Sequence, residues 1–278
     1  MEPLIAELGD GYRVIAPDRR GHGRTPDADG DWHFEEFAAD TAQLLDDLGL
    51  ATVHVLGWSD GSIEGLYLAL ARPDLVRSLV FGAAPFQVDG WNDGVLEETL
   101  PDFLAEAYGE VSPDGVGHWP QVVAKSALLH TLEPAIDPDR LRALTIPVLV
   151  LVGDDDEVRL EHTLETYGLL PDGELAIVPR ATHALVVEKP DLVARLVRDF
   201  HNPDKTNGFA PYRRPTNGFS RAADREVGRQ AARWRRSWRR LRSRLRSRLH
   251  PGGCAPEPRV AVRLRDARSR QSDARRPR

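Results

Sequence analysis

The chain has 278 residues, of which 41% are hydrophobic, so it can bury the core of one large domain or of two small ones. Its single cysteine, Cys254, excludes a disulfide framework and a cysteine-based metal site, and it fits a reducing, cytoplasmic location. No apolar run approaches the roughly 20 residues that a membrane-spanning helix needs, and we expect neither a transmembrane segment nor a secretory signal.

The net charge of −6 is divided unevenly along the chain. Residues 1–202 carry 14 Lys and Arg against 37 Asp and Glu, whereas residues 203–278 carry 23 against 6. The last helical pattern, "PDLVARLVRDF", ends at Phe200, where the composition changes. We therefore expect a globular domain over 1–202 and a separate Arg-rich tail over 203–278.

The globular part alternates strand and helix patterns. "YRVIAPD" predicts a strand that runs into the glycine-rich loop "RRGHGRTPD", and "FEEFAADTAQLLDDLGL" predicts a helix with one apolar face. "VHVLGW" predicts the next strand, followed by a helix that stops at Pro73, and "SLVFGAA", "PVLVLVG" and "ELAIVP" predict three more strands. Apolar strands that alternate with helices indicate an α/β fold, a doubly wound and mostly parallel sheet with both faces covered.

One segment breaks this alternation. "VLEETLPDFLAEAYGEV" and "WPQVVAKSALL" predict two helices with no strand between them. The insertion follows the carboxyl end of a predicted strand, which is the end where ligands bind in such sheets. We therefore expect residues 86–145 to form a helical lid over a site.

The stretch "GWSDG" lies at the junction of a predicted strand and a predicted helix. A reversal over about four residues forces its central residue, Ser59, into strained backbone angles. Gly57 and Gly61 are expected to remove two β-carbons that would otherwise collide there. The serine hydroxyl would then be held at the carboxyl end of a strand, which suits a nucleophile.

A serine hydroxyl is a weak nucleophile at neutral pH and needs a base beside it. His183 follows the last predicted strand and can accept the proton, since an imidazole titrates near neutrality. A carboxylate would orient the imidazole, and three consecutive acids after "VLVLVG" compete for that role: Asp154, Asp155 and Asp156.

The G-x-S-x-G pattern between strand and helix, followed by an acid and then a histidine, resembles the α/β-hydrolase fold family over nearly all of residues 1–200. The resemblance implies a serine esterase or amidase that acts on a small acyl substrate without a cofactor or metal. It implies Ser59 as nucleophile, His183 as base and Asp156 as acid, because the family's acid commonly lies three residues after the strand-ending glycine.

The residues that flank the serine carry further expectations. The backbone N–H of Asp60 follows the nucleophile and should stabilise the oxyanion. Its carboxylate would favour a substrate with a cationic amine, and "GWSD" resembles the elbow of the valacyclovir-hydrolase-like branch, which cleaves α-amino-acid esters. The sequence departs from that branch at Ser62, where a glycine is usual. Asp60 could instead face solvent or cap the helix, and Trp58 could line the pocket or serve packing alone.

Other histidines are expected to have structural places. His22, in "RGHGR", fits a loop residue better than a second base, and the remaining histidines show no partner pattern. We expect them at the surface or in the packing of the domain.

The resemblance also implies eight strands, whereas the first strand of this chain matches the family's fourth. The missing part would include a loop that supplies a second oxyanion donor, whose loss costs on the order of 10²–10³ in rate. Two explanations follow: an incomplete amino terminus, or a decayed relative that binds a small ligand without activity.

The tail raises a different possibility. "RWRRSWRRLRSRLRSRLH" places five apolar residues on one helical face, with arginines over the rest: Trp234, Trp238, Leu241, Leu245 and Leu249. A basic amphipathic helix of this kind binds an anionic membrane or a nucleic acid. A disordered extension is the alternative, and it is the one that we expect, with no nucleic-acid partner.

Overall fold

A computed structural model describes residues 1–97, 101–202 and 262–264. By its contacts the chain divides into one unit of Met1–Lys205 with Pro258–Arg278, and a second unit of Thr206–Glu257. The helix predicted in the tail lies outside the described residues. Within the described ranges, every helix is too short or too polar to cross a bilayer.

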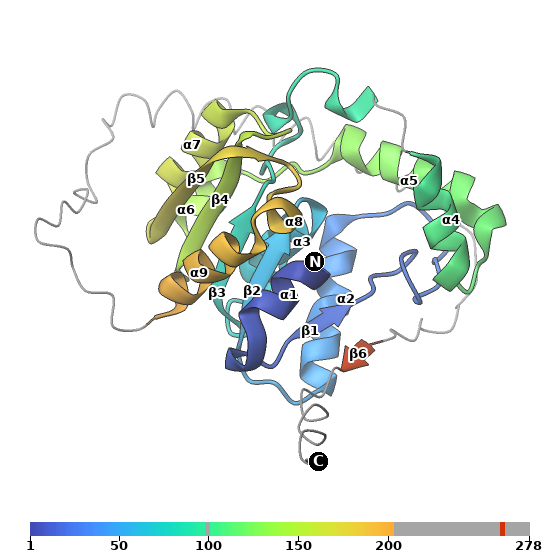
Figure 1. Ribbon diagram of the computed structural model, residues 1–278, viewed down its shortest axis with the longest axis horizontal. Coiled ribbons are helices and arrows are strands. Elements are labelled where there is room, and N and C mark those ends of the chain that lie inside the picture. Colours follow the sequence, from blue (N-terminus) through green and yellow to red (C-terminus); the bar gives the residue numbers. More distant parts are fainter. Residues whose placement is uncertain (98–100, 203–261, 265–278) are drawn as a thin grey trace, which may run out of the picture. The chain divides into compact units, whose positions relative to one another are not determined.

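The centre of the first unit is a parallel sheet of four strands in the order β2-β3-β4-β5 (Figure 1). The strands are β2 Val53–Trp58, β3 Val76–Gly82, β4 Val148–Asp155 and β5 Gly173–Thr182. Ladders between consecutive neighbours align the carboxyl ends of all four strands at one edge. The expected α/β class with a parallel sheet is confirmed.

The first predicted strand differs from the expectation. β1 is confined to Ile15–Pro17 and pairs antiparallel with β6, Val262–Leu264, outside the four-stranded sheet. β2 is the edge strand of that sheet, and no ladder joins it to β1. The apolar pattern of "YRVIAPD" correctly indicates extended chain, but a pattern does not specify which strand the chain pairs with.

Alternate residues of the central strands enter two separate cores. Leu79 and Val150 pack with the cluster that contains α2 and α3, whereas Val80, Leu149 and Leu151 pack with the cluster that contains α1 and α9. Successive side chains of a strand point to opposite faces, so this division means that both faces of the sheet are covered.

The helices form a layer on each face (Figure 1). One layer comprises α2 Phe34–Asp47, α3 Asp60–Ala71, α6 Pro138–Arg142 and α7 Leu160–Leu169. The other comprises α1 Glu2–Leu8, α8 Leu185–Glu188 and α9 Pro190–His201. A short 3₁₀ turn, η1 Gly9–Gly11, follows α1.

The chain between β3 and β4 contains the predicted lid segment. Its elements are η2 Val88–Gly90, η3 Val95–Glu97, α4 Asp102–Val111, η4 Val116–His118 and α5 Trp119–Leu132. The described residues of this segment form no strand ladder, and α4 and α5 correspond to the two predicted helices.

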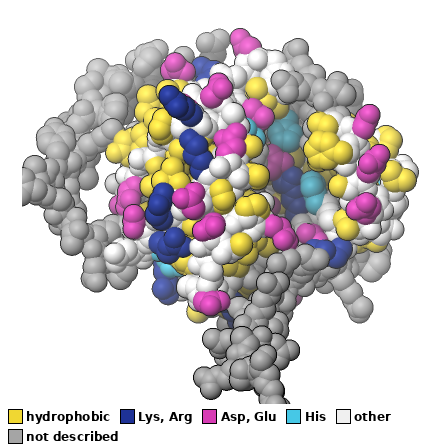
Figure 2. Space-filling view, viewed as in Figure 1, with side chains coloured by type: hydrophobic (Ala, Val, Ile, Leu, Met, Phe, Trp, Pro, Cys, Tyr) yellow, Lys and Arg dark blue, Asp and Glu magenta, His cyan; other side chains and the backbone are white. Residues whose placement is uncertain are grey.

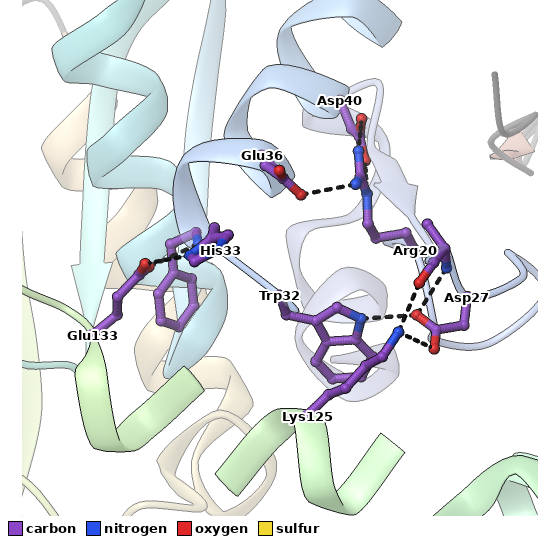
Figure 3. A network of polar contacts seen from close by, with 10 residues as sticks. Arg20, Asp27, Trp32, His33, Glu36, Asp40, Lys125 and Glu133 are labelled. Carbon is purple, nitrogen blue, oxygen red and sulfur yellow. Dashed lines mark hydrogen bonds and ion pairs between the residues drawn. The ribbon is translucent and has the colours of Figure 1, made fainter. Parts of the chain in front are cut away.

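Polar contacts join α5 to the chain that follows β1 (Figure 3). Asp27 accepts hydrogen bonds from Lys125 Nζ at 2.6 Å and from Trp32 Nε1 at 2.8 Å. At the end of α5, Glu133 lies 2.8 Å from the His33 Nδ1 atom. Because the Asp27 carboxylate is almost fully buried, its pairing fixes the position of α5 more firmly than a surface ion pair would.

Candidate active site

The elbow between β2 and α3 holds Ser59 in a strained conformation. Its φ is 54° and its ψ −128°, angles that a non-glycine residue adopts at a cost on the order of 1–3 kcal/mol. A β-carbon at Gly57 would collide with the backbone of Gly61 and Ser62, so glycine is required there. The matching expectation for Gly61 is wrong, because open space lies where its β-carbon would be.

Backbone and side-chain bonds join this elbow to the end of β3. The Ser59 N–H donates to the Gly82 carbonyl at 2.9 Å. The fully buried Ser62 hydroxyl donates to the same carbonyl at 2.7 Å and accepts from the Gly82 N–H at 2.8 Å. Ser62, the departure from the branch pattern, therefore has a structural explanation: its hydroxyl satisfies both backbone groups of a buried glycine.

Asp156 and His183 lie in direct contact at the carboxyl edge of the sheet. The Asp156 Oδ1 atom is 2.9 Å from His183 Nδ1, and the carboxylate side chain is 1% exposed. The neighbouring acids lie elsewhere: Asp154 accepts from the Ala181 N–H at 3.2 Å, and Asp155 is exposed. Of the three acids that competed from sequence, Asp156 is the one that contacts the imidazole.

The loop that carries His183 is held by Trp58. The Trp58 indole N–H donates to the His183 carbonyl at 2.8 Å, a bond that the sequence did not predict. Burial alone would lower the pKa of His183, but the Asp156 carboxylate outweighs it and the pKa is raised. The second nitrogen, Nε2, lies 3.6 Å from the Glu157 carboxylate, beyond hydrogen-bond distance. That nitrogen is therefore available to exchange a proton.

The Asp60 carboxylate is paired on both of its oxygens. Oδ2 accepts from Arg19 Nη2 at 2.6 Å, and Oδ1 lies 2.7 Å from His130 Nε2. Burial would raise the pKa of Asp60, but Arg19 and His130 outweigh it and hold the pKa well below its usual range. The Asp60 side chain is 21% exposed, and each of its two oxygens already has a partner.

His130, on α5, is a residue that the sequence did not single out. Its Nε2 faces the Asp60 carboxylate and its Nδ1 lies 2.8 Å from the Ser126 carbonyl, so both nitrogens face acceptors and both carry protons. Burial lowers its pKa, Asp60 raises it more, and the result is a raised pKa. No sequence pattern indicated this partner, because it lies 70 residues away on the elbow.

Arg19 and His22 belong to the glycine-rich loop after β1. His22 Nε2 lies 3.1 Å from Arg19 Nη2, and its Nδ1 lies 3.0 Å from the Arg20 carbonyl. Burial and the Arg19 charge lower the pKa of His22 to about 4, so this imidazole is neutral at pH 7. The loop therefore supplies Asp60 with a single permanent cation.

A cavity of about 390 Å³ opens beside His183. Its lining consists of Asn92, Val95, Asp155, Asp156, Glu157, Thr182, His183 and Ala184. Figure 2 shows a hollow between the helices α4 and α5 and the rest of the domain, in which histidine, basic and acidic side chains gather. Among the described residues no cluster of three or more His, Cys, Asp or Glu could hold a metal ion.

Comparison with known proteins gives one family. A model described as the α/β hydrolase fold matches residues 1–133. The non-heme chloroperoxidase of Streptomyces lividans is 31% identical, over 69% of this chain and 84% of its own. RutD of Variovorax paradoxus (strain S110), assigned as a carbamate hydrolase, is 31% identical over 71% and 84%. The 2-(acetamidomethylene)succinate hydrolase of Mesorhizobium japonicum is 25% identical over 72% and 82%.

Solved structures agree on the fold. The meta-cleavage product hydrolase CumD of Pseudomonas fluorescens IP01 superimposes with a TM-score of 0.58 at 20% identity, over 72% of this chain and 83% of its own. A thermophilic esterase from Thermogutta terrifontis gives 0.56 at 24% identity over the same shares. With the parallel sheet, the strained serine at its carboxyl edge and these relatives, the chain belongs to the α/β-hydrolase fold family.

Proposed function

We propose that this hydrolase cleaves small esters or amides through an acyl-enzyme, with Ser59 as nucleophile, His183 as general base and Asp156 as the orienting acid. The observation that carries the proposal is the contact of a buried carboxylate with one nitrogen of His183, whose other nitrogen makes no hydrogen bond to the described residues. Ser59, held at positive φ, follows Trp58, whose indole N–H donates to the His183 carbonyl, and this connection supports the pairing of this serine with this base.

Acylation begins when Ser59 Oγ attacks the carbonyl carbon and its proton passes to His183 Nε2. The Asp156 carboxylate stabilises the imidazolium that forms and keeps the Nδ1 proton in place. The tetrahedral intermediate collapses with cleavage of the bond to the leaving group, which takes the proton from Nε2. The acyl group remains on Ser59 as an ester.

Deacylation repeats these steps with water. His183 Nε2 removes a proton from the water molecule as its oxygen attacks the acyl carbon, and the same proton then returns to Ser59 Oγ. The products are the carboxylic acid and the free enzyme, so atoms and charge balance without a cofactor.

The Asp60 N–H is the oxyanion donor in this proposal. It belongs to the first residue of α3, where backbone N–H groups have no partner within the helix. The positive end of the helix dipole adds to the stabilisation of the negative oxygen. This role needs only the backbone of Asp60 and does not depend on its carboxylate.

The proposed substrate is a small neutral acyl compound rather than an α-amino ester. The likeness of "GWSD" to the valacyclovir-hydrolase-like branch favours an ammonium at Asp60, but such a group would have to displace Arg19 or His130 from a doubly paired carboxylate. The names of two relatives, a carbamate hydrolase and a 2-(acetamidomethylene)succinate hydrolase, support hydrolysis of an acyl compound.

A fluorophosphonate probe tests the nucleophile directly. The full chain should be labelled at Ser59, as located by peptide mass spectrometry, and Ser59→Ala should remove the label. Ser62→Ala is the matched control, since Ser62 lies on the same elbow with its hydroxyl bonded to Gly82, and this variant should still be labelled. Equal labelling of wild type and Ser59→Ala would refute Ser59 as the nucleophile, and a wild-type chain without any label would favour a ligand-binding relative without this chemistry.

A further inference from the structure

Trp91 lies at the start of the lid segment, where its backbone is joined to the loop of the proposed triad acid. It forms an isolated antiparallel bridge with Val158. The next residue, Asn92, donates from its backbone N–H to the Glu157 carbonyl at 2.8 Å and from its side chain to the Asp156 carbonyl at 2.9 Å. The backbone that positions Asp156 therefore also fixes the position of Trp91.

The indole ring of Trp91 lies beside the two imidazoles of the site. Its centroid is 6.4 Å from that of His183 and 6.3 Å from that of His130, and it meets both rings edge-on at 62° and 70°. Trp91 thus contacts the proposed base and the lid histidine that pairs with Asp60.

The indole N–H of Trp91 is buried and has no hydrogen-bond partner among the described residues. The residue is 7% exposed, and burying a donor without a partner destabilises the protein. Buried Trp N–H groups usually have a partner. An acceptor on a bound substrate would supply one and would recover that free energy in the complex.

We propose that Trp91 is a specificity-determining residue, whose indole N–H donates to a neutral oxygen of the substrate other than the scissile carbonyl oxygen. This inference rests on the proposed hydrolase function and adds a substrate class to it: acyl compounds with a second carbonyl group.

The charges near the two histidines favour a neutral acceptor. Asp60 is paired with Arg19 and His130, and the Asp156 and Glu157 carboxylates lie beside His183. A carboxylate or an ammonium on the substrate would meet a charge of its own sign among these groups, whereas a carbonyl dipole meets no such repulsion.

Turnover of matched esters tests the proposal. One pair, 4-nitrophenyl 4-oxopentanoate and 4-nitrophenyl pentanoate, differs by one carbonyl in the acyl group, and a second pair, 2-oxopropyl and propyl butyrate, differs by one carbonyl in the leaving group. The wild-type chain should prefer the oxo ester of at least one pair by about tenfold or more in kcat/KM. Trp91→Phe, which keeps a ring but has no N–H, should bring the oxo-to-plain ratio of kcat/KM close to one.

Trp119→Phe is the matched control, because it removes an indole N–H from the beginning of α5, where the ring packs on Tyr108. It should keep the preference. If both esters of each pair are hydrolysed at ratios that Trp91→Phe does not change, Trp91 has no such role while the hydrolase proposal stands. A preference for 4-nitrophenyl hydrogen succinate over both members of the first pair would overturn the neutral class.

A binding measurement separates this inference from catalysis. In full-length Ser59→Ala, the Trp91 indole N–H resonance, assigned by its loss in Ser59→Ala/Trp91→Phe, should move on addition of methyl 4-oxopentanoate or 2-oxopropyl butyrate. Methyl pentanoate and propyl butyrate should leave it in place. Movement with an oxo ester supports Trp91 even where no hydrolysis is observed, and an unmoved resonance at concentrations that shift His183 resonances refutes it.

Discussion

Two aspartate–histidine pairs flank the nucleophile elbow, and they differ in what else each partner contacts. Asp156–His183 joins the carboxylate to Nδ1 at 2.9 Å, and Asp60–His130 joins it to Nε2 at 2.7 Å. Asp60 also binds Arg19, and the other nitrogen of His130 faces the Ser126 carbonyl. The other nitrogen of His183 makes no hydrogen bond to the described residues.

The difference separates the pair that we propose for proton transfer from a pair that we expect to be structural. A histidine whose two nitrogens both face acceptors holds two protons and has no lone pair to offer, so His130 cannot serve as a base in this arrangement. His183 has one nitrogen oriented by Asp156 and one available for exchange. A contact between a carboxylate and an imidazole is therefore insufficient to identify a catalytic pair, because the remaining nitrogen decides.

The largest effect expected from this comparison is on turnover. Asp156→Asn should lower kcat by about 10⁴-fold, because an amide no longer holds the Nδ1 proton that keeps Nε2 basic. Asp60→Asn should lower kcat less than about tenfold, since the backbone N–H that serves the oxyanion is kept. Steady-state hydrolysis of 4-nitrophenyl pentanoate measures both variants. Similar losses from the two substitutions would mean that both pairs take part in proton transfer.

A smaller effect is expected on stability. His130→Gln loses a charge-assisted bond between α5 and the elbow. Because solvent partly screens this pair, the free energy of unfolding should fall by only about 1–2 kcal/mol. Because the folded pKa of His130 is raised, this contribution is complete below the unfolded value near 6.5 and disappears as pH rises through the folded pKa. Urea unfolding of wild type and variant between pH 5 and 9 should show the difference shrinking with rising pH.

His162→Gln is the control for that series, because its effect on the free energy of unfolding should change with pH in the opposite direction. Burial lowers the pKa of His162 to about 4, and its Nε2 accepts the Phe86 N–H at 3.2 Å, so the folded state favours the neutral ring. This group destabilises the protein as pH falls from about 6.5 to 4. His162→Gln should therefore gain stability relative to wild type over that range. If the two histidine variants respond to pH in the same direction, the assignment of charge to His130 is wrong.

The sequence predicted the proposed triad because each member follows a strand in a local pattern. Ser59 lies in a motif with its own turn chemistry, and His183 and the three acids follow apolar strands whose carboxyl ends meet at one edge of a parallel sheet. The sheet class followed from the same strand–helix alternation. The resemblance to the family favoured Asp156 among the three acids, and the structure adds the 2.9 Å contact of its carboxylate with His183 Nδ1.

The Asp60 network and Trp91 could not be predicted in this way. Arg19, Asp60 and His130 come from a loop, the elbow and the lid, and no local pattern records that they meet. Their contacts depend on how α5 lies over the elbow, which the pattern of a helix does not specify. The place of β1 outside the four-stranded sheet could not be predicted either, because the partner of a strand lies far away in the sequence.

Replacing Glu157 should change how kcat/KM falls at low pH, the acid limb of its pH profile. Activity needs neutral His183, whose pKa is raised by Asp156 against the effect of burial and raised further by Glu157. Glu157→Gln should therefore move the acid limb of kcat/KM to lower pH, by a small amount because this carboxylate is 44% exposed. Asp155→Asn, in the same cavity, is the control and should leave the limb in place. A limb that moves to higher pH would contradict the position of Glu157 beside Nε2.

The smallest effect concerns Arg19, which distinguishes the two pairs most directly. The Arg19 charge lowers the pKa of His130, although less than Asp60 raises it. Arg19→Gln should therefore raise the pKa of His130 further, as its pairing with Asp60 comes to resemble that of His183 with Asp156. The pKa of His22, lowered by burial and by Arg19, should move up from about 4 in the same variant.

Histidine ¹H–¹⁵N correlation spectra recorded across a pH titration measure each ring separately, and His183, on whose pKa Arg19 has no marked effect, is the internal control. Arg19 would have no part in the network if His130 titrates at the same pH in both proteins, and a shared shift of all three histidines would indicate a general loosening of the domain instead of the loss of one charge.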